Sequence, residues 1–599
     1  MFKKLNDVLG KTAVIIKRYP MVLVMAFISA ISMICYIETD FPKTEAAFEY
    51  VKLTLISALG ISLFFGLKML SQRIGRELIL QLCGLIILAV IYFVLPTLEK
   101  DFTEVYAFVL IPILILSHLL VSFVAFIGHN KELNFWQYNK NLFINTFLTG
   151  IFTGVLTGGV LLAILAIDKL FDFNFNSTYY SYTFAFFSIF GSCCIFLLFN
   201  EKGLNYLERN GDYPVVLKFF TQYILIPLLL IYAVILYFYS AKILMNWELP
   251  RGWVSYLILA YSVVGILALL LVHPLKESAT RSWVKIFSTI FYYTLLPLII
   301  LLFVAIFTRI LEYGFTEPRY FVLIIALWLT SVVLYFIFIP RSTIKFVPMS
   351  LFTFGLLSLI FPYINAFSTA KRSQKNELMK TLTENNLLQN GTINFNTKVD
   401  NKVVIDVSDK FEFLAKRHEE QFLQSLVKSP LQKRLATHIE KGAFYNISGS
   451  LRDEFKNITY DNSSINPEST PQNRTLTVRN SNINITGYQY LFKAYNYRQN
   501  SFNLEGKTLE FDLDGNHSQS KFTLVYEGQK FDLLPEITEI FKRYPGVGET
   551  NVSSLDITRK IGDYEIKVIF DNLVRIDSKE KKNEFSTNSE SVLILVKKN

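Results

Sequence analysis

Residues 105–127 read VYAFVLIPILILSHLLVSFVAFI, and this stretch decides the fold class of the chain. It is 23 residues long and contains no Asp, Glu, Lys or Arg. A helix of about 20 apolar residues is long enough to cross the hydrocarbon core of a bilayer. Because lipid offers no hydrogen-bond partners to the backbone, an uninterrupted apolar run of this length is predicted to span the membrane as a helix.

Apolar runs of the same kind fill the first 365 or so residues. The whole chain of 599 residues is 52% hydrophobic and 18% charged, whereas soluble domains average about 25% charged residues. These values exclude an ordinary soluble enzyme, a disordered protein and a disulfide scaffold. About eleven spans are predicted, at 19–37, 50–70, 78–96, 105–127, 142–167, 180–200, 215–241, 253–273, 284–309, 319–339 and 344–364.

The short loops between these runs alternate in charge, which predicts the orientation of the chain. The loops between the basic ones are acidic or balanced. Basic residues cluster on the cytoplasmic side of membrane proteins, so the N-terminus is predicted to be cytoplasmic. Eleven crossings then place the C-terminal region outside the cytoplasm. The basic residues are Lys3, Lys4, Lys11, Lys17 and Arg18, followed in alternate loops by Arg73 and Arg76, Lys131 and Lys140, Lys202 and Arg209, Lys276 and Arg281, and Arg341 and Lys345.

The composition changes abruptly after Phe367. The segment 367–390 is predicted to be a juxtamembrane helix, because Leu378 and Leu382 share one face of it. Short alternating stretches beyond about residue 470 are typical of strands. The predicted fold is therefore an α-helical polytopic membrane bundle over 1–366, followed by a soluble α+β extracytoplasmic domain over 391–599.

A repeated Thr-Gly pair marks the fifth predicted span. Residues four apart lie on one helix face, so the glycines form a groove and the threonines form a ridge beside it. Such a surface lets a neighbouring helix approach to backbone distance, which predicts helix packing. The alternative is a narrow polar path through the bundle. The residues concerned are Thr149, Gly150, Thr153, Gly154, Thr157 and Gly158.

Charged and aromatic residues gather in two loops that the orientation places outside. Tryptophan and tyrosine anchor helices at the membrane interface, which explains the aromatic residues alone. The charged residues either pair with one another or bind an anionic head group, since arginine binds phosphate oxygens in a fork. If these loops bind a ligand, the predicted site consists of Lys242, Trp247 and Trp253 from one loop and Arg309, Glu312, Glu317 and Arg319 from the other.

Catalytic and metal-binding motifs are absent. No nucleotide-binding P-loop, zinc-protease motif or C-x-x-C pair occurs, and the four cysteines all lie before residue 195 in apolar runs. The polar His118 stands in a span without a carboxylate partner. The sequence therefore predicts no cofactor and no metal, and it leaves an enzymatic role uncertain but disfavoured. Since most of the formal net charge of +10 belongs to the loop bias, membrane lipids are the expected partners and nucleic acid is not.

The chain resembles a family of bacterial multipass inner-membrane proteins named domain of unknown function four-one-five-three, in a form typical of the Bacteroidetes. The resemblance implies an inner-membrane location and no particular activity. The segments that carry it are 135–143 (FWQYNKNLF), 168–171 (DKLF), 222–227 (QYILIP), 247–255 (WELPRGWVS), Arg309, 313–320 (YGFTEPRY) and 487–491 (GYQYL).

Three functions from different classes remain open. The first is a non-enzymatic membrane protein whose periplasmic domain binds, senses or scaffolds a periplasmic or membrane protein partner. The second is a transporter or lipid-handling permease for an anionic or lipid-linked substrate. The third is a membrane enzyme acting on a lipid-linked substrate, with Glu317 or Asp168 as base. A lipid-sized cavity between the spans favours the second, and a closed bundle with a grooved tail favours the first.

Overall fold

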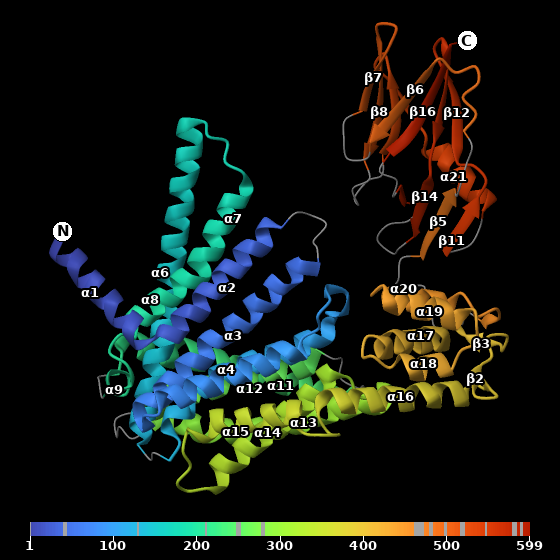
Figure 1. Cartoon of the computed structure of the whole chain (residues 1–599). Helices are drawn as coiled ribbons and strands as arrows, with labels where there is room; N and C mark the ends of the chain where they lie inside the picture. Colours follow the sequence, from blue (N-terminus) through green and yellow to red (C-terminus); the bar gives the residue numbers. More distant parts are fainter. Residues whose placement is uncertain are drawn as a thin grey trace. The chain divides into compact units, whose positions relative to one another are not determined.

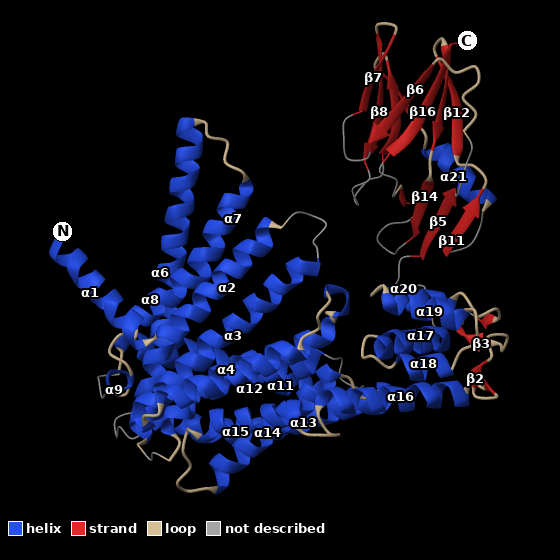
Figure 2. Ribbon diagram, in the orientation of Figure 1, coloured by secondary structure: helices blue, strands red, loops and turns tan. Residues whose placement is uncertain are grey.

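The chain forms two compact units, Met1–Thr459 and Tyr460–Asn599, and each is described by itself (Figure 1). The first unit is almost entirely helical, and the second consists mainly of strands (Figure 2). The computed structural model describes residues 2–39, 45–128, 131–209, 213–246, 253–276, 282–459, 472–478, 483–495, 500–514, 521–544, 548–577, 584–587 and 591–598.

Ten helices within the described residues are long and apolar enough to cross a membrane, so the predicted membrane bundle is confirmed (Figure 1). Helix α1 (Phe2–Arg18) precedes them. The ten are α2 (Pro20–Glu38), α3 (Glu45–Ile74), α4 (Glu77–Val94), α5 (Ala107–Phe123), α6 (Glu132–Phe171), α7 (Ser177–Phe186) with α8 (Ser192–Phe199), α10 (Val215–Phe219) with α11 (Ile226–Asn246), α12 (Trp253–Val272), α13 (Ser282–Tyr313) and α14 (Glu317–Phe338).

Two of these spans contain a wider turn. A π-helix at Phe187–Gly191 joins α7 to α8, and another at Phe220–Leu225 joins α10 to α11. Such π segments inside α-helices are frequent at functional sites. Short connectors complete this part of the chain: α9 (Leu204–Leu207) and 3₁₀ turns at Glu99–Asp101, Glu104–Tyr106, Val124–Phe126 and His273–Lys276.

The eleventh predicted span, 344–364, corresponds to α15 (Phe346–Ile360), which has only 15 residues. At 1.5 Å per residue it is about 22 Å long, shorter than the roughly 30 Å of hydrocarbon in a bilayer. Its direction is nevertheless fixed by a contact, because Arg417, which follows α15 in the chain, binds Glu317 at the start of α14. Helices α14 and α15 therefore run out and back, and the chain after α15 returns to the face where α14 begins.

Two clusters of buried apolar residues form the core of the bundle. One joins α1–α5, the first half of α6, and α8, and is centred on residues such as Tyr19, Phe64 and Tyr138. The other joins α11–α14 around Phe291 and Leu329. Helix α15 contributes Val347 to the second cluster and packs against α5 of the first.

A small helical domain follows the bundle within the first unit. Its core contains Leu378, Leu382 and Phe411, so the predicted amphipathic face of the juxtamembrane segment is buried as expected. Asn365 and Asp400 begin two of its helices by accepting hydrogen bonds from the first-turn amides of Ser368 and Lys402. The elements are α16 (Ala366–Glu384), β1 (Leu388–Gln389), β2 (Thr392–Ile393), β3 (Val399–Asp400), α17 (Asn401–Ala415), α18 (Glu420–Ser425), α19 (Leu431–Glu440), α20 (Tyr445–Arg452) and β4 (Ile458–Thr459).

The second unit, where the structure describes it, contains three four-stranded sheets and the helix α21 (Leu534–Arg543). The strand orders are β10-β9-β8-β7, β11-β5-β14-β15 and β12-β13-β16-β6, and β11 pairs with β5 in parallel. The strands are β5 (Gln472–Val478), β6 (Tyr490–Tyr495), β7 (Asn500–Leu504), β8 (Lys507–Asp514), β9 (Lys521–Tyr526), β10 (Gln529–Asp532), β11 (Gly548–Val552), β12 (Asp556–Ile561), β13 (Tyr564–Ile569), β14 (Asn572–Asp577), β15 (Glu584–Ser586) and β16 (Ser591–Lys598).

The alternating stretches expected beyond about residue 470 form strands, among them β5, β8 and β13. The expected domain boundaries, 366 and 391, stay a prediction, and the two compact units divide after Thr459. Residues 366–459 belong to the compact unit that contains the bundle, and the β-rich unit begins at Tyr460.

Candidate functional site

Two places in the first unit gather polar side chains: a junction between the helical domain and the bundle, and a cavity inside the bundle. At the centre of the junction Arg417 binds Glu317. Arg417 Nε and Nη2 donate to Glu317 Oε1 and Oε2 at 2.7 and 2.8 Å. The two side chains are 4% and 0% exposed, so this bidentate pair is fully desolvated. Arg417 also stacks on the ring of Phe413, 3.3 Å from its centroid.

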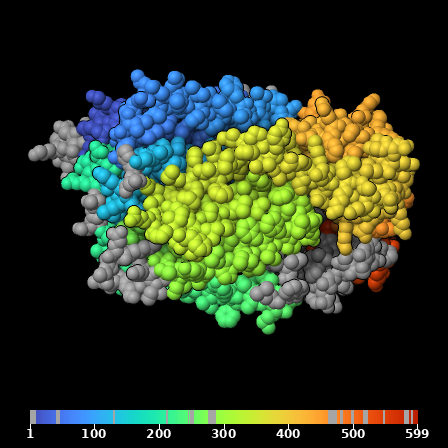
Figure 3. Space-filling view, turned by 90° about the horizontal axis from the view of Figure 1, so that it is seen from below, coloured from blue at the N-terminus to red at the C-terminus, as the bar shows by residue number. Residues whose placement is uncertain are grey.

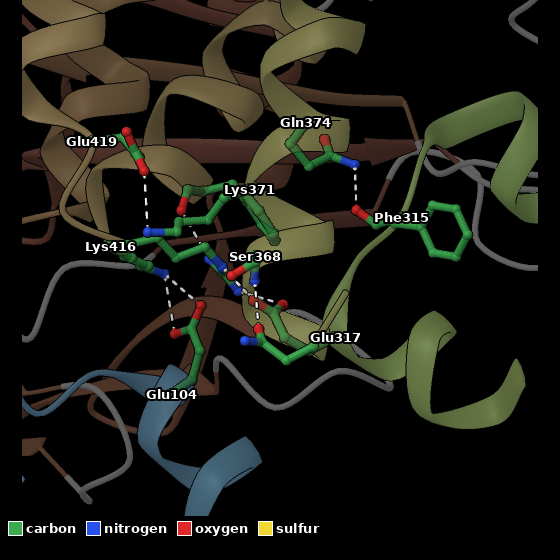
Figure 4. Close-up of polar contacts among 11 residues, drawn as sticks. Glu104, Phe315, Glu317, Ser368, Lys371, Gln374, Lys416 and Glu419 are labelled. Atoms are coloured by element: carbon green, nitrogen blue, oxygen red, sulfur yellow. Dashed lines mark hydrogen bonds and ion pairs between the residues drawn. The ribbon is translucent and has the colours of Figure 1, made fainter. Parts of the chain in front are cut away.

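The loop before Glu317 is held by α16 (Figure 4). Gln374 Nε2 donates to the carbonyls of Tyr313 and Phe315, and the Phe315 amide donates to Ser373 Oγ. Gly314 has a φ of +71°, and a Cβ there would lie 2.8 Å from Glu377. The Gly in the 313–320 segment is therefore required both by its backbone conformation and by the close approach of α16.

Ion pairs surround this centre. Lys416 Nζ lies 3.1 Å from Glu104 Oε1, and Glu419 binds Lys371 (Figure 4). Glu419 also forms an ion pair with Lys375. Burial alone would raise the pKa of Glu419, but hydrogen bonds and charge from the two lysines outweigh it and hold the pKa below its ordinary value. For Lys416, burial is outweighed by Glu412 and Glu104, so its pKa is raised.

Seen from below, the helical domain is in continuous contact with the bundle (Figure 3).

Of the charged residues of the predicted outer ligand site, Arg309, Glu312 and Arg319 lie around Tyr313, whereas Glu317 is bound by Arg417. Glu317 is occupied by Arg417, and the prediction that a structural Glu317 would pair with Arg309 or Arg319 was wrong. Arg319 Nη1 instead donates to the carbonyls of Tyr313 and Gly314 at 3.1 and 2.8 Å. The guanidinium carbons of Arg309 and Arg319 lie 5.9 and 5.4 Å from the centroid of the Tyr313 ring.

Glu312 is exposed but lies beside Tyr313, to which it is hydrogen-bonded, and near Arg319. Lys242 is exposed and, within the described residues, forms no ion pair or hydrogen bond with this group. Trp247 lies outside the described residues, and of Trp253 only its place at the start of α12 is described. A ligand bound by these residues stays a prediction. Sequence reasoning missed Arg417 because it stands 100 residues from Glu317, and no local pattern in the sequence connects the two.

The second place is a cavity of about 830 Å³ inside the bundle. It lies where the two apolar cores meet, between α3, α5, α6, α8, α12 and α15. Most of its lining is apolar, and the polar lining residues are Ser62, His118, Ser122, Asn139, Lys140, Thr146, Thr149, Ser188, Ser192 and Cys193.

Lys140 is the charged residue of this lining. It is 8% exposed, its Nζ donates to Gln137 Oε1 at 2.8 Å, and it lies 5.5 Å from the ring of Trp136. Among the residues that the structure describes, no carboxylate lies within 4 Å of Lys140 Nζ. Ionisable residues inside a membrane bundle are costly and therefore point to function. In the sequence, Lys140 stands out only as a loop charge that predicts the orientation.

Neighbouring polar groups are ordered by hydrogen bonds. Asn139 Nδ2 donates to the carbonyls of Ser122 and Phe135, and Ser122 Oγ donates to Asn139 Oδ1. His118 Nδ1 lies 2.9 Å from the Leu114 carbonyl oxygen. Because a carbonyl oxygen only accepts, Nδ1 carries the hydrogen and Nε2 of His118 is left for another partner.

The cavity lies in one half of the bundle and is open at its side. The residues of α5, α6 and α15 that line it are the ones nearest to the basic loops: 118–122, 135–149 and 344–351. Phe143 and Leu267 line it and are still 47% and 39% exposed. The cavity therefore communicates with the surroundings of the bundle at the level of these two side chains.

The Thr-Gly repeat on α6 is divided between two faces. Thr149 and Thr157 are buried, and Thr149 lines the cavity, whereas Thr153 is only partly buried. The groove side is different, because a Cβ added at Gly150, Gly154 or Gly158 would meet nothing within 4 Å. Contrary to the prediction, no helix in the described part of the chain packs into the glycine groove.

In the described ranges, no three or more histidine, cysteine, aspartate or glutamate side chains are grouped so that they could hold a metal ion. Asp168, considered as a catalytic base, is buried and accepts from the Phe175 amide at 2.6 Å. It therefore fixes the turn after α6.

The bundle and its cavity define a multipass α-helical membrane protein. The chain belongs to the family described as Domain of unknown function (DUF4153), whose model matches residues 22–390. It is also similar to Uncharacterized protein PM1469 of Pasteurella multocida (strain Pm70), with 31% identity over 183 residues. That match covers 29% of this chain and 30% of the relative's length. No solved structure matches. The expected Bacteroidetes type stays a prediction.

Proposed function

We propose that this protein is a transporter or lipid-handling permease that takes an amphiphilic, lipid-like ligand into the cavity of its membrane bundle. The observation that carries the proposal is the cavity of about 830 Å³ between the spans. Ligand pockets in proteins measure about 300–1,000 Å³ and are mostly apolar with a few convergent polar groups. This cavity has that size and that kind of lining.

The distribution of polar groups favours an amphiphile over a wholly polar solute. Lys140 and Asn139 stand among apolar neighbours such as Phe135, Leu270 and Leu351. A polar solute would leave many of its hydrogen-bonding groups unpaired against these side chains, at a cost of about 1–3 kcal/mol each. An amphiphile places its chain against them and its head against the polar residues.

The way into the cavity also fits a ligand that arrives from the bilayer. The exposed lining residues Phe143 and Leu267 are apolar and belong to spans, so the opening faces lipid if the spans cross as proposed. The π-helix that carries Ser188 and Ile189 borders the same space. Helices kink at such π segments, which favours the bending that a permease needs.

The cellular setting belongs to the same proposal. The alternation of loop charges supports an inner-membrane protein with its N-terminus in the cytoplasm and residues 366–599 in the periplasm. The ion pairs of Glu104 with Lys416 and of Glu317 with Arg417 support a single outer face. They join two acidic loops to the segment that follows the last span.

A second candidate function is binding of a protein partner by the periplasmic region. One observation favours it: residues 460–599 form their own compact unit around a separate core that includes Leu476, Phe511 and Ile594. A unit with an independent core can present a binding surface without altering the bundle. Both functions can belong to one protein.

The test of the first function is the lipid content of the purified protein. The chain is extracted in a mild detergent, washed, and its bound lipids are measured by mass spectrometry against the same amount of Ser192→Trp. Ser192 lines the cavity, so the indole occupies part of the space that the ligand would use. The matched control is Ser181→Trp, an exposed serine in α7 outside the lining.

We expect one class of amphiphile to be enriched in the wild type and in Ser181→Trp, and to be lost in Ser192→Trp at unchanged melting temperature. Equal, nonselective lipid content in all three proteins would contradict the proposal.

A further inference from the structure

We infer that the cavity ligand is a single-chain amphiphile with an anionic head, that the head binds Lys140, and that the chain lies along α6 toward Thr149. This inference rests on the proposed function and names its substrate class. Four observations support it: the charge of Lys140, the groups around it, the size of the cavity and the depth of Lys140 in the bundle.

Within the described ranges, no carboxylate compensates the charge of Lys140. Other lysines at the spans have carboxylates beside them: Lys52 lies 3.3 Å from Glu49, and Lys68 lies 2.6 Å from Glu77. Lys140 is buried to a similar degree as Lys52, yet among the described groups its hydrogen-bond partner is the neutral amide of Gln137 at 2.8 Å. A buried charge without an opposite charge is strongly destabilising, which an anion in the cavity would relieve.

Hydrogen-bonding capacity remains for such an anion. An ammonium group has three hydrogens, and Gln137 accepts one from Lys140. The Asn139 amide group already donates twice to backbone carbonyls, so it fixes the local geometry. Lys140 is therefore the group that donates to the anion. His118 presents Nε2 in the same lining, since its Nδ1 hydrogen is directed to Leu114. In the neutral ring this nitrogen accepts, which suits a hydroxyl of the head, and in the imidazolium form it donates.

The volume selects a single chain. The cavity of about 830 Å³ falls within the roughly 300–1,000 Å³ of pockets that bind drug-sized ligands. One acyl chain with a small head such as a carboxylate or a phosphate is a ligand of that size. A diacyl phospholipid has nearly twice as many atoms, so one of its chains would have to remain outside.

The depth of Lys140 suits a head group. It lies eight residues into α6, about 12 Å from Glu132, and the apolar run that predicts the span begins at residue 142. The ammonium group is therefore at the level of the membrane interface, where the neighbouring Trp136 is also typical. The lining continues on α6 to Thr149, about 14 Å deeper, which gives the chain an apolar path.

The test measures the affinity of the protein in nanodiscs for four probes: dodecanoate, dodecyl phosphate, 1-lauroylglycerol and dodecyltrimethylammonium. The first two share a single chain with an anionic head, the third is neutral and the fourth is cationic. The variants are Lys140→Gln, Lys140→Arg and, as the matched control, Lys52→Gln, which makes the same change at a carboxylate-paired lysine outside the cavity lining.

We expect the wild type to bind both anionic probes at least tenfold more tightly than the neutral probe. Lys140→Gln is expected to bind all the single-chain probes equally, while Lys140→Arg and Lys52→Gln keep the preference. Binding of the neutral probe by Lys140→Gln shows that this variant is folded. If Lys140→Gln loses that binding and also melts at a lower temperature, Lys140→Met replaces it, because methionine keeps an unbranched side chain and removes the charge. Lys140→Met is then expected to lose the anionic preference, and a preference that survives in it would overturn the inference.

The remaining outcomes are distinct. If no probe binds to the wild type, the proposed function fails. If all the probes bind with equal affinity, or if the preference for anionic probes survives in both Lys140 variants, the cavity binds amphiphiles but the inference that the head binds Lys140 is wrong. If dioleoyl phosphatidic acid binds more tightly than dodecyl phosphate, the claim that the ligand has a single chain is wrong. If inorganic phosphate binds as tightly as dodecyl phosphate, the claim that the ligand is an amphiphile is wrong.

Discussion

At the scale of single residues, the buried pair of Arg417 and Glu317 ties the helical domain to the first turn of α14. Removing one partner leaves the other charge buried and unpaired, which typically costs about 3–5 kcal/mol. We therefore predict that Arg417→Leu and Glu317→Leu each lower the free energy of unfolding by about that amount, and that the double variant loses less than the sum. Chemical denaturation in detergent measures all three.

The control for this cycle is Glu384→Leu, which removes an exposed carboxylate from the last turn of α16. We expect its free energy of unfolding to change by no more than about 0.5 kcal/mol, as for most surface substitutions. Strict additivity of the two Leu variants at the buried pair would contradict a direct interaction between Arg417 and Glu317.

Glu419 makes the same junction sensitive to acid. Its pKa is held below the ordinary 4.5 because the two lysines outweigh the effect of burial. A carboxyl group whose pKa is lowered on folding contributes stability above its unfolded pKa, and this contribution is lost as the pH falls through the folded value. We predict that the melting temperature falls as the pH drops below about 4.5 and that part of this fall is absent in Glu419→Gln.

Thermal unfolding from pH 3 to pH 7, about the range over which carboxyl groups titrate, checks this prediction. Glu384→Gln, at an exposed glutamate of α16, is the control and should keep the pH dependence of the wild type. Identical pH profiles for Glu419→Gln and the wild type would contradict the role given to Glu419.

These residue pairs could not be predicted from the sequence. Glu317 is recognisable as a candidate because it lies in a charged loop, but its partner lies in a helical domain 100 residues away. Lys140 stands near a predicted loop, where a lysine normally faces water. Its burial depends on α3, α12 and α15 closing around it, which no local pattern records.

At the scale of elements, the open face of α6 gives a prediction that separates two glycines. Gly154 has nothing within 4 Å of an added Cβ, whereas a Cβ at Gly265 in α12 would lie 2.1 Å from the Phe291 ring. Gly154→Leu should leave stability unchanged or raise it by up to about 1 kcal/mol through helix propensity. Gly265→Leu should destabilise by about 1–3 kcal/mol or more through overpacking.

Melting temperatures of the two variants in detergent measure the difference. A large loss in Gly154→Leu would mean that a helix from a second copy or another protein covers the groove. The elements themselves were predictable from hydropathy, because apolar runs of span length leave few alternatives in lipid. The face of α6 that other helices cover could not be predicted, because glycine and threonine suit both a tight helix contact and a lipid-facing surface.

At the scale of the whole molecule, we predict that the two ends of the chain face opposite sides of the membrane. A reporter active only in the cytoplasm should work when inserted within 128–141, and one active only in the periplasm should work when fused at Asn599. The reason is the odd number of crossings, since the short α15 brings the chain back across the bundle after the ten longer helices. Cytoplasmic activity at Asn599 would contradict this topology.

The membrane bundle and a β-rich C-terminal region were predictable at this scale, because hydropathy and alternation are properties of the chain itself. The attachment of residues 366–459 to the bundle was not, since it depends on contacts such as those of Lys416 and Arg417 with distant charges. The cavity was not predictable either, because a void is defined by the residues that surround it from several helices.

The most direct test of the central claim is an experimental structure of the full chain in lipid nanodiscs. We predict continuous elongated density in the cavity between α5, α6 and α15, with one end against Lys140 Nζ and the other near Thr149. A bundle in which these helices close on one another, or a cavity that contains only separate water peaks around Lys140, would contradict the claim.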